Sequence, residues 1–378
     1  MKHEIKPKVN YGKVGIMTMY RIANYGSVFQ AYALMTYIKK LGYDCTLINY
    51  LFPNSYHKKV QRYSILKTTI VRIYHFLIGN PYKKKRKRFE DFYRNYLCET
   101  ARQYKSPNEL KLTNELFDFF VTGSDQVWNY NKVGKDESFM LGFVDDGKKM
   151  ISYSSSFSHD YIPEEYAPIY KKCLSRYAHI SVREKSGLKI VKELIGKDAE
   201  CTLDPTFLLG RDEYDKIAAH HEVKINKPFI LVYILSYAYN PYPYIEEVIE
   251  HLHVQTGLDV VAVGLSNKSL RNKSWLKKYL YASPSDFLYL YSKADGVITT
   301  SFHGTVFSMI YEKPFISVIP SVTNDNRISN VLSQFNMTDR ILKIGDVLEN
   351  CNFKDFAKPA NWEQLINQSK LYLKNSLQ

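Results

Sequence analysis

The alternation of apolar runs with helical stretches is the feature that most constrains the fold of this chain. Residues 14–19 (VGIMTM) predict a strand, residues 28–42 carry apolar side chains at helical spacing, and residues 43–50 (YDCTLINY) predict a second strand. A strand, a helix and a strand in succession form one βαβ unit. Because the connection crosses over the sheet, the two strands of such a unit lie parallel.

The second half of the chain restarts this pattern. Residues 229–235 (FILVYIL) form a continuous apolar run, as is typical of a central strand in a parallel sheet, and a helix over 242–256 and a strand over 258–264 follow. A chain of 378 residues is too long for one hydrophobic core. We therefore predict an α/β protein with two Rossmann-like domains and parallel sheets. This organisation resembles the GT-B architecture, which places the active site in the interdomain cleft.

The domain boundary is expected near residue 205. Residues 1–205 are predicted to form an N-terminal Rossmann-like domain, which includes a basic helical excursion over residues 56–100. Residues 206–360 are predicted to form a C-terminal Rossmann-like domain. Residues 361–378 then form a helix that can cross back to the N-terminal domain.

The net charge of +14 is concentrated in that excursion. Between Cys45 and Phe89 there are eleven Lys or Arg residues and no Asp or Glu. A basic block of this kind suits an anionic phospholipid surface, while a solvated basic face without a partner is the alternative. No nucleic-acid module accompanies it, so nucleic acid is not expected as a partner. The predicted membrane-binding residues are Lys83, Lys84, Lys85, Arg86, Lys87 and Arg88.

Several classes of protein are disfavoured by what the sequence lacks. The five cysteines are scattered without metal-ligand spacing, and no apolar run approaches the ~20 residues of a membrane span. The N-terminus has no secretory h-region, so a cytoplasmic location is expected. GxGxxG, P-loop, HExxH and GxSxG motifs are missing, and no suitable loop carries a DxD-like motif. Neither a cofactor nor a metal ion is therefore predicted.

Two polar loops follow predicted strands of the first half. In an open α/β sheet, ligands bind outside the carboxyl ends of the strands. Residues 24–27 (NYGS) follow the first strand, although they can equally serve only to shape the turn. Residues 122–129 (TGSDQVWN) follow the strand at 116–121, and so dense a polar cluster is costly to bury without partners, which favours a site over a purely structural loop. The candidate contacts in the two loops are Asn24, Tyr25, Gly26, Asp125, Gln126, Trp128 and Asn129.

Two further strand ends carry groups suited to an anion. Arg183 follows the strand at 179–182, although a salt bridge to Glu184 or another acid is the alternative. Residues 295–314 (DGVITTSFHGTVFSMIYEKP) predict a strand, a turn over 301–304 and a helix from Thr305. The helix N-terminus and Gly304 favour a bound phosphate or carboxylate. His303 adds a titratable donor, unless it is a helix-cap or core histidine.

Five stretches in register resemble the polysaccharide pyruvyl transferase family. They are NYGSVFQAYAL at 24–34, VTGSDQVWN at 121–129, ISVREKSG at 180–187, LDPTFLL at 203–209 and SFHGTVFSMIYEKPF at 301–315. The resemblance implies a GT-B-like fold, with phosphoenolpyruvate as the donor and a sugar diol as the acceptor. The expected products are a cyclic pyruvate ketal and phosphate.

The resemblance also implies roles for individual residues. Arg183 and His303 correspond to donor contacts of the family, and His303 is our candidate general acid. Members of the family tend to carry Arg two positions before that histidine, where this chain has Ser301. From their location, Lys313 or Arg327 can restore the missing charge. The candidate donor-binding residues are thus Arg183, Ser301, His303, Gly304, Lys313 and Arg327.

For the acceptor that the resemblance implies, Asp125 is the candidate base, and the candidate acceptor contacts are Asn24, Tyr25, Gly26, Gln126, Trp128 and Asn129, of which Trp128 can stack on a sugar face. The N-terminal domain is then the acceptor side and the C-terminal domain the donor side.

The expected acceptor is a lipid-linked oligosaccharide in capsule or exopolysaccharide assembly. The basic block then holds the enzyme peripherally at the inner face of the bacterial plasma membrane. Two alternatives remain. One is a GT-B glycosyltransferase that uses a nucleotide sugar, and the other is a basic scaffold that gathers assembly enzymes at the membrane.

Overall fold

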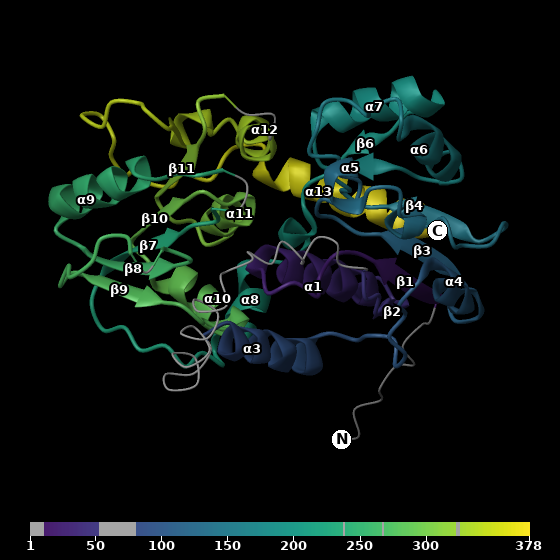
Figure 1. The fold of residues 1–378 in the computed structure, drawn as a ribbon, viewed down its shortest axis with the longest axis horizontal. Helices are drawn as coiled ribbons and strands as arrows, with labels where there is room; N and C mark the ends of the chain where they lie inside the picture. The colour runs from purple at the N-terminus through teal and green to yellow at the C-terminus, as the bar shows by residue number, and fades with distance from the viewer. Residues whose placement is uncertain (1–10, 53–80, 237–238, 267, 323–325) are drawn as a thin grey trace, which may run out of the picture. The chain divides into compact units, whose positions relative to one another are not determined.

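The computed structural model describes residues 11–52, 81–236, 239–266, 268–322 and 326–378 (Figure 1). Contacts between Cα atoms divide them into two compact units. The described residues of the first unit are 11–52, 96–209 and 363–378. Those of the second unit are 81–95 and 210–362, apart from the gaps given above.

The first unit is built on a parallel sheet with the strand order β2-β1-β3-β4. Two short parallel strands, β5 and β6, pair with each other, and a backbone bridge between Ser155 and Val182 connects them to the segment after β4. Because the strands are parallel, the residues that follow them gather at one edge of the sheet. The bounds are β1 (Lys13–Met17), β2 (Asp44–Leu47), β3 (Phe119–Thr122), β4 (Lys149–Ser152), β5 (Ser181–Val182) and β6 (Glu200–Cys201).

The helices of the first unit include one from the end of the chain. In α13 (yellow in Figure 1), the Ser369 hydroxyl accepts a hydrogen bond from the Leu203 N–H at 3.0 Å, and the Tyr372 hydroxyl donates to the Ser152 carbonyl at 2.9 Å. The bounds are α1 (Tyr25–Lys40), α4 (Pro107–Leu110), α5 (Tyr130–Val133), α6 (Ala167–Leu174), α7 (Lys185–Ile195), α13 (Trp362–Leu377) and the 3₁₀ segments η1 (Lys111–Glu115), η2 (Glu137–Met140) and η3 (Pro205–Leu208).

The second unit is built on a parallel sheet with the order β12-β11-β10-β7-β8-β9. All five residues of β7 are buried. Ile230 and Val232 share an apolar core with α9, whereas the ring of Tyr233 lies 5.0 Å from that of Phe287 in α10. Alternate side chains of this strand therefore face helices on opposite sides of the sheet. The bounds are β7 (Phe229–Tyr233), β8 (Asp259–Val263), β9 (Leu276–Tyr279), β10 (Gly296–Thr299), β11 (Phe315–Ile319) and β12 (Ile341–Lys343).

The basic helix α3 belongs to the second unit, whereas the sequence placed the excursion in the N-terminal domain. Arg88 explains this grouping, because it forms ion pairs with Asp286 at 2.8 Å and with Glu222 at 2.5 Å. Asp286 also completes a capping box with Ser283 at the start of α10. The part of the excursion at residues 56–80 lies outside the described residues. The bounds are α3 (Pro81–Tyr96), α8 (Arg211–Ala218), α9 (Tyr244–Thr256), α10 (Pro284–Lys293), α11 (Phe302–Ile310), α12 (Arg327–Gln334) and the 3₁₀ segment η4 (Thr338–Arg340).

Helices on both faces of a parallel sheet confirm the predicted α/β class. Strands β9 and β12 and helix α8 were not predicted. The ends of the predicted elements differ from the observed ones by a few residues, as for β3, which begins at Phe119 rather than at Leu116.

Candidate functional site

The loop after β3 places a carboxylate at the carboxyl edge of the first sheet. Asp125 has φ +71°, a left-handed conformation that Asp adopts more readily than most residues with a Cβ. Its Oδ2 accepts a hydrogen bond from the Ser27 hydroxyl at 2.7 Å, and its Oδ1 accepts one from the Gln126 N–H at 2.9 Å. Asp125 is only partly buried, whereas Ser124 and Gln126 on either side are buried. Asp125 is therefore the carboxylate of this loop that a ligand can reach.

The residues of the first polar loop begin helix α1. The Asn24 Oδ1 accepts hydrogen bonds from the Gly26 N–H at 2.9 Å and from the Ser27 N–H at 3.3 Å, as an N-cap residue does. Tyr25 is buried in the core of the unit, and Gly26 is buried as well. The structure thus gives Asn24 and Tyr25 structural roles, and their contact with an acceptor stays a prediction. Ser27 is the residue of this loop that reaches Asp125.

Trp128 is a core residue, so its predicted stacking on a sugar is wrong. Its side chain is fully buried, with ring centroids of Phe157 and Tyr177 at 5.1 Å and 5.8 Å, and its Nε1–H donates to the Phe139 carbonyl at 3.2 Å. These partners come from other parts of the chain, and they surround the indole so that its faces are not available to a ligand.

Two amides of the same loop, both predicted as acceptor contacts, bond to each other. The Asn129 side-chain amide donates to the Gln126 Oε1 at 3.2 Å, and the Asn129 Oδ1 caps α5 by accepting the Asn131 N–H at 3.0 Å. Both side chains are buried. This geometry shapes the loop around Asp125, and it leaves a direct contact with the acceptor as a prediction.

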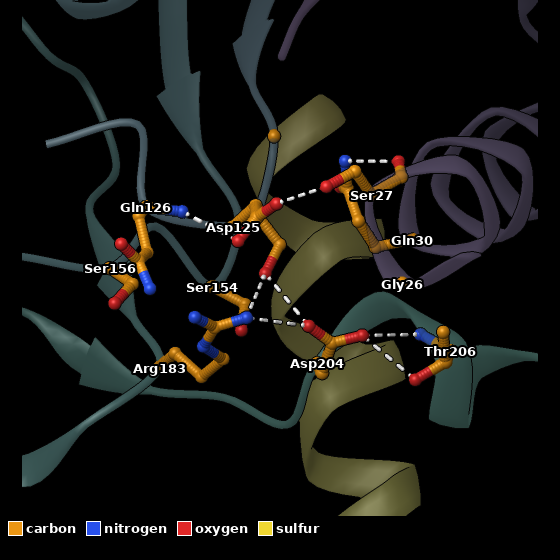
Figure 2. A network of polar contacts seen from close by, with 12 residues as sticks. Gly26, Ser27, Gln30, Asp125, Gln126, Ser154, Ser156, Arg183, Asp204 and Thr206 are labelled. Atoms are coloured by element: carbon orange, nitrogen blue, oxygen red, sulfur yellow. Dashed lines mark hydrogen bonds and ion pairs between the residues drawn. The ribbon is translucent and has the colours of Figure 1, made fainter. Parts of the chain in front are cut away.

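Arg183 lies in a buried network of polar groups rather than on an open surface (Figure 2). The residue is only 4% exposed. Its Nη1 donates to the Asp204 Oδ2 at 3.0 Å, and its Nε donates to the Glu184 Oε1 at 3.2 Å. The alternative of a salt bridge to Glu184 is therefore present in the structure, and Asp204 adds a second one. Contact with a donor stays a prediction.

The network reaches the loop of Asp125 through two serines. The Ser124 hydroxyl donates to the Asp204 Oδ2 at 3.0 Å, and the Ser156 hydroxyl donates to the Glu184 Oε1 at 2.6 Å. The Ser156 N–H also donates to the carbonyl of Asp125 at 3.1 Å. We call these residues the Arg183 network: Ser124, Ser156, Arg183, Glu184 and Asp204. Apart from Arg183, sequence reasoning did not assign them to the site. Their common signal is that each follows a parallel strand: Ser124 and Ser156 follow β3 and β4 of the four-stranded sheet, and the other three follow β5 and β6.

In the second unit, helix α11 begins earlier than predicted. The helix starts at Phe302 instead of Thr305, because the Ser301 hydroxyl accepts the Gly304 N–H at 3.2 Å and caps the first turn. The serine at the position where the family tends to carry Arg therefore serves as the helix cap. His303 lies in the first helical turn at the carboxyl edge of β10 and is 6% exposed. Its role as a donor contact stays a prediction.

Gly304 lets helix α11 pack closely on the sheet. A Cβ added at this position would lie 2.1 Å from the Thr299 Oγ1 and 3.0 Å from the Tyr233 Cδ1. Both neighbours belong to strands of the sheet, β10 and β7. Packing against the sheet therefore explains this glycine, and approach of an anion to its backbone stays a prediction.

Lys313 and Arg327, the two predicted substitutes for the missing arginine, lie at opposite edges of the sheet of the second unit. Lys313 precedes β11, and burial together with the positive charges of Arg211 and Lys293 lowers its pKa. Because β10 and β11 are parallel, Lys313 lies at the amino edge of the sheet and Ser301 at the carboxyl edge. The prediction that Lys313 supplies charge beside Ser301 is therefore wrong. Arg327 is the first residue of α12, which follows β11, and it is buried. Because β10 and β11 are parallel neighbours, Arg327 and Ser301 share the carboxyl edge.

Each unit thus has its own candidate residues: Asp125, bonded to Ser27, in the first, and His303 and Arg327 at the carboxyl edge of the sheet in the second. Among the residues that the structure describes, His, Cys, Asp and Glu side chains form no group of three or more that is placed to hold a metal ion. The same part of the chain contains no helix with the length and apolar character that crossing a membrane requires.

The parallel sheets and their helices define a protein of the GT-B fold class. The structure is similar to UDP-GlcNAc 2-epimerase from Methanocaldococcus jannaschii, with 10% identity, a TM-score of 0.50 and coverage of 94% of this chain and 98% of that chain. It is also similar to S. aureus MnaA solved with UDP, with 13% identity, a TM-score of 0.50 and coverage of 96% and 97%. At such low identity these likenesses establish the fold alone.

The sequence itself establishes the family. The chain belongs to the polysaccharide pyruvyl transferase family, whose model matches residues 24–321. A search among curated proteins found no match.

Proposed function

We propose that the protein transfers the enolpyruvyl group of phosphoenolpyruvate to two hydroxyls of a sugar and releases phosphate. The observation that carries this proposal is the family match over residues 24–321, which includes both Asp125 and His303. The acceptor is a lipid-linked oligosaccharide in capsule or exopolysaccharide biosynthesis, and the product is a cyclic pyruvate ketal. No cofactor other than the co-substrate is needed for this reaction.

The charge of the donor suits the cluster of the second unit. Phosphoenolpyruvate carries a phosphate and a carboxylate, about three negative charges near neutral pH. Arg327 and the N-terminal turn of α11 lie at one edge of the sheet, and guanidinium groups and helix N-termini both bind such anions. His303 lies in the first turn of that helix, and this position supports its proposed role on the same ligand.

The reaction needs one proton donor and one proton acceptor. We assign to His303 the transfer of a proton to the methylene carbon of the donor, which makes C2 electrophilic. A sugar hydroxyl then attacks C2 as Asp125 takes its proton, phosphate leaves, and a second hydroxyl closes the ring. Of the two protons that the hydroxyls release, one balances the proton taken up by the methylene and the other leaves with phosphate.

The test is phosphate release from phosphoenolpyruvate with a panel of lipid-linked galactose- and mannose-type acceptors, followed by mass spectrometry of the product. A gain equal to pyruvate less one water supports the proposal. No release with any acceptor, together with binding of a UDP- or GDP-sugar, would favour the glycosyltransferase instead. A His303→Ala variant that kept near-full turnover would remove the acid role.

We also propose that α3 docks the enzyme on an anionic membrane surface. Its residues do not contribute equally, because Arg88 is engaged with Asp286 and Glu222, and Lys85 is partly buried over the ring of Phe89. The exposed basic residues of the block are Lys83, Lys84, Arg86 and Lys87.

The apolar face of α3 is used inside the protein, since Phe89, Phe92 and Tyr93 are buried. Docking is therefore electrostatic, about 1 kcal/mol for each basic residue near the surface, and is weakened by salt. Changing Lys83, Lys84, Arg86 and Lys87 to Gln should release the protein from phosphatidylserine vesicles. Unchanged binding would contradict the proposal, and neutral phosphatidylcholine vesicles are the control.

A further inference from the structure

A cluster of aromatic rings lies beside the candidate site of the first unit. The ring of Tyr130 stacks on that of His159 at 4.5 Å and on that of Tyr166 at 5.4 Å, with interplanar angles of 27° in both pairs. The ring of Tyr161 lies 6.3 Å from Tyr130. We call these residues the aromatic platform: Tyr130, His159, Tyr161 and Tyr166.

The platform shares the carboxyl edge of the sheet with Asp125. Tyr130 begins α5, directly after the loop that follows β3, and the other three residues lie in the segment after β4. Strands β3 and β4 are parallel neighbours. Beyond the ends of these strands, the backbone N–H of Trp128 donates to the Ser156 carbonyl at 3.2 Å, which connects the segment after β3 to the segment after β4. The platform is therefore on the side where ligands of such sheets bind.

The exposure of the platform is not explained by packing alone. Tyr161 is 62% exposed, although its ring lies against Tyr130, which is 8% exposed. An exposed ring that packs against a buried ring offers an apolar face with polar groups at its margin. The Asn131 side-chain amide, which lies 3.1 Å from the His159 Nε2, supplies such polar groups.

The charges around the platform favour a neutral ligand. Asp160, Glu164 and Glu165 are exposed in the same segment, and they disfavour a phosphate or a carboxylate on this surface. A pyranose meets these conditions, because it has an apolar C–H face that stacks on aromatic rings and hydroxyls that bond to amides and phenols.

We propose that the aromatic platform binds the acceptor sugar and presents its hydroxyls to Asp125. The identification of the ligand as the acceptor rests on the proposed function, whereas binding of a neutral pyranose does not. The platform takes over the stacking role that sequence reasoning gave to the buried Trp128.

The test is saturation-transfer NMR of the full chain with methyl β-galactoside and methyl α-mannoside, together with steady-state kinetics. Tyr161→Ala should weaken binding of the sugar that gives a signal roughly 3- to 10-fold and raise the acceptor KM by a similar factor. The phosphoenolpyruvate KM should not change. Tyr11→Ala is the matched control, because Tyr11 is 59% exposed and its ring is tilted against that of Tyr43 at 5.6 Å, but it precedes β1 at the opposite edge of the sheet.

The outcomes separate this inference from the proposed function. A sugar signal that falls in Tyr161→Ala but not in Tyr11→Ala supports the platform, even if phosphoenolpyruvate is not consumed. Turnover of phosphoenolpyruvate with an acceptor KM unchanged in both Tyr161→Ala and His159→Ala would overturn the platform and leave the proposed function intact. Absence of any signal from both glycosides with the wild-type protein would also overturn it.

Discussion

Replacing Arg183 by Met separates a structural role from a contact with the donor. The substitution keeps most of the side-chain length but removes the hydrogen bonds to Asp204 at 3.0 Å and to Glu184 at 3.2 Å. Both carboxylates then stay buried, since the side chains of Asp204 and Glu184 are 0% and 4% exposed. The free energy of unfolding of the first unit should fall.

The size of the loss follows from what remains around the two carboxylates. Removing one partner of a buried ion pair typically costs about 3–5 kcal/mol. Asp204 keeps the hydroxyls of Ser124 and Thr206, and Glu184 keeps the hydroxyl of Ser156. These donors partly replace the guanidinium, so we expect a loss near the lower end, about 3 kcal/mol.

Differential scanning calorimetry is the appropriate assay, because a chain of two units need not unfold in one step. Adding Asp204→Asn and Glu184→Gln to Arg183→Met should recover part of the loss, because the triple variant no longer buries uncompensated charge. An Arg183→Met variant with an unchanged melting temperature and a raised phosphoenolpyruvate KM would refute the reasoning and assign Arg183 to the donor.

The second unit offers three further tests. Arg327→Met should raise the phosphoenolpyruvate KM about tenfold or more, whereas Lys313→Met should leave it unchanged, because of these two residues only Arg327 lies at the same carboxyl edge as Ser301. Steady-state kinetics of both variants is the measurement. Lys313→Met should raise the melting temperature at neutral pH, because burial and neighbouring cations lower the pKa of Lys313. That gain should shrink in melts at higher pH, as the wild-type lysine becomes neutral in the folded state. Gly304→Ala should lower the free energy of unfolding measured in urea by about 1–3 kcal/mol, and adding Thr299→Ala to that variant should recover part of the loss.

The sequence predicted the central strands better than the edge strands. Strand β7 begins at residue 229, as predicted, and all five of its residues are buried, so its apolar run is complete. Strands β9 (LKKY) and β12 (ILK) lie at the two edges of the sheet and are partly exposed. Lysines are tolerated there, and the apolar signal that identifies a central strand is lost.

The strand ends that carry the candidate residues could be predicted, but the surroundings of several side chains could not. Asp125 and His303 follow strands, and the parallel order of the sheet brings such positions to the carboxyl edge. The burial of Trp128 depends on Phe139 and Tyr177, which are distant in sequence. The role of Arg183 likewise depends on Asp204, a partner that no local pattern identifies.

Several of the residues that carry the family resemblance stabilise the fold around the candidate site residues. In the first unit, Asn24 caps α1, Trp128 fills the core and Arg183 joins Asp204. In the second unit, Ser301 caps α11 and Gly304 permits its close packing. Changes at these five positions should act first on stability. Changes at Asp125, His303 and Arg327 should act first on turnover or the KM of the donor. Melting temperatures and steady-state kinetics therefore distinguish the residues that support the fold from those that act on a ligand.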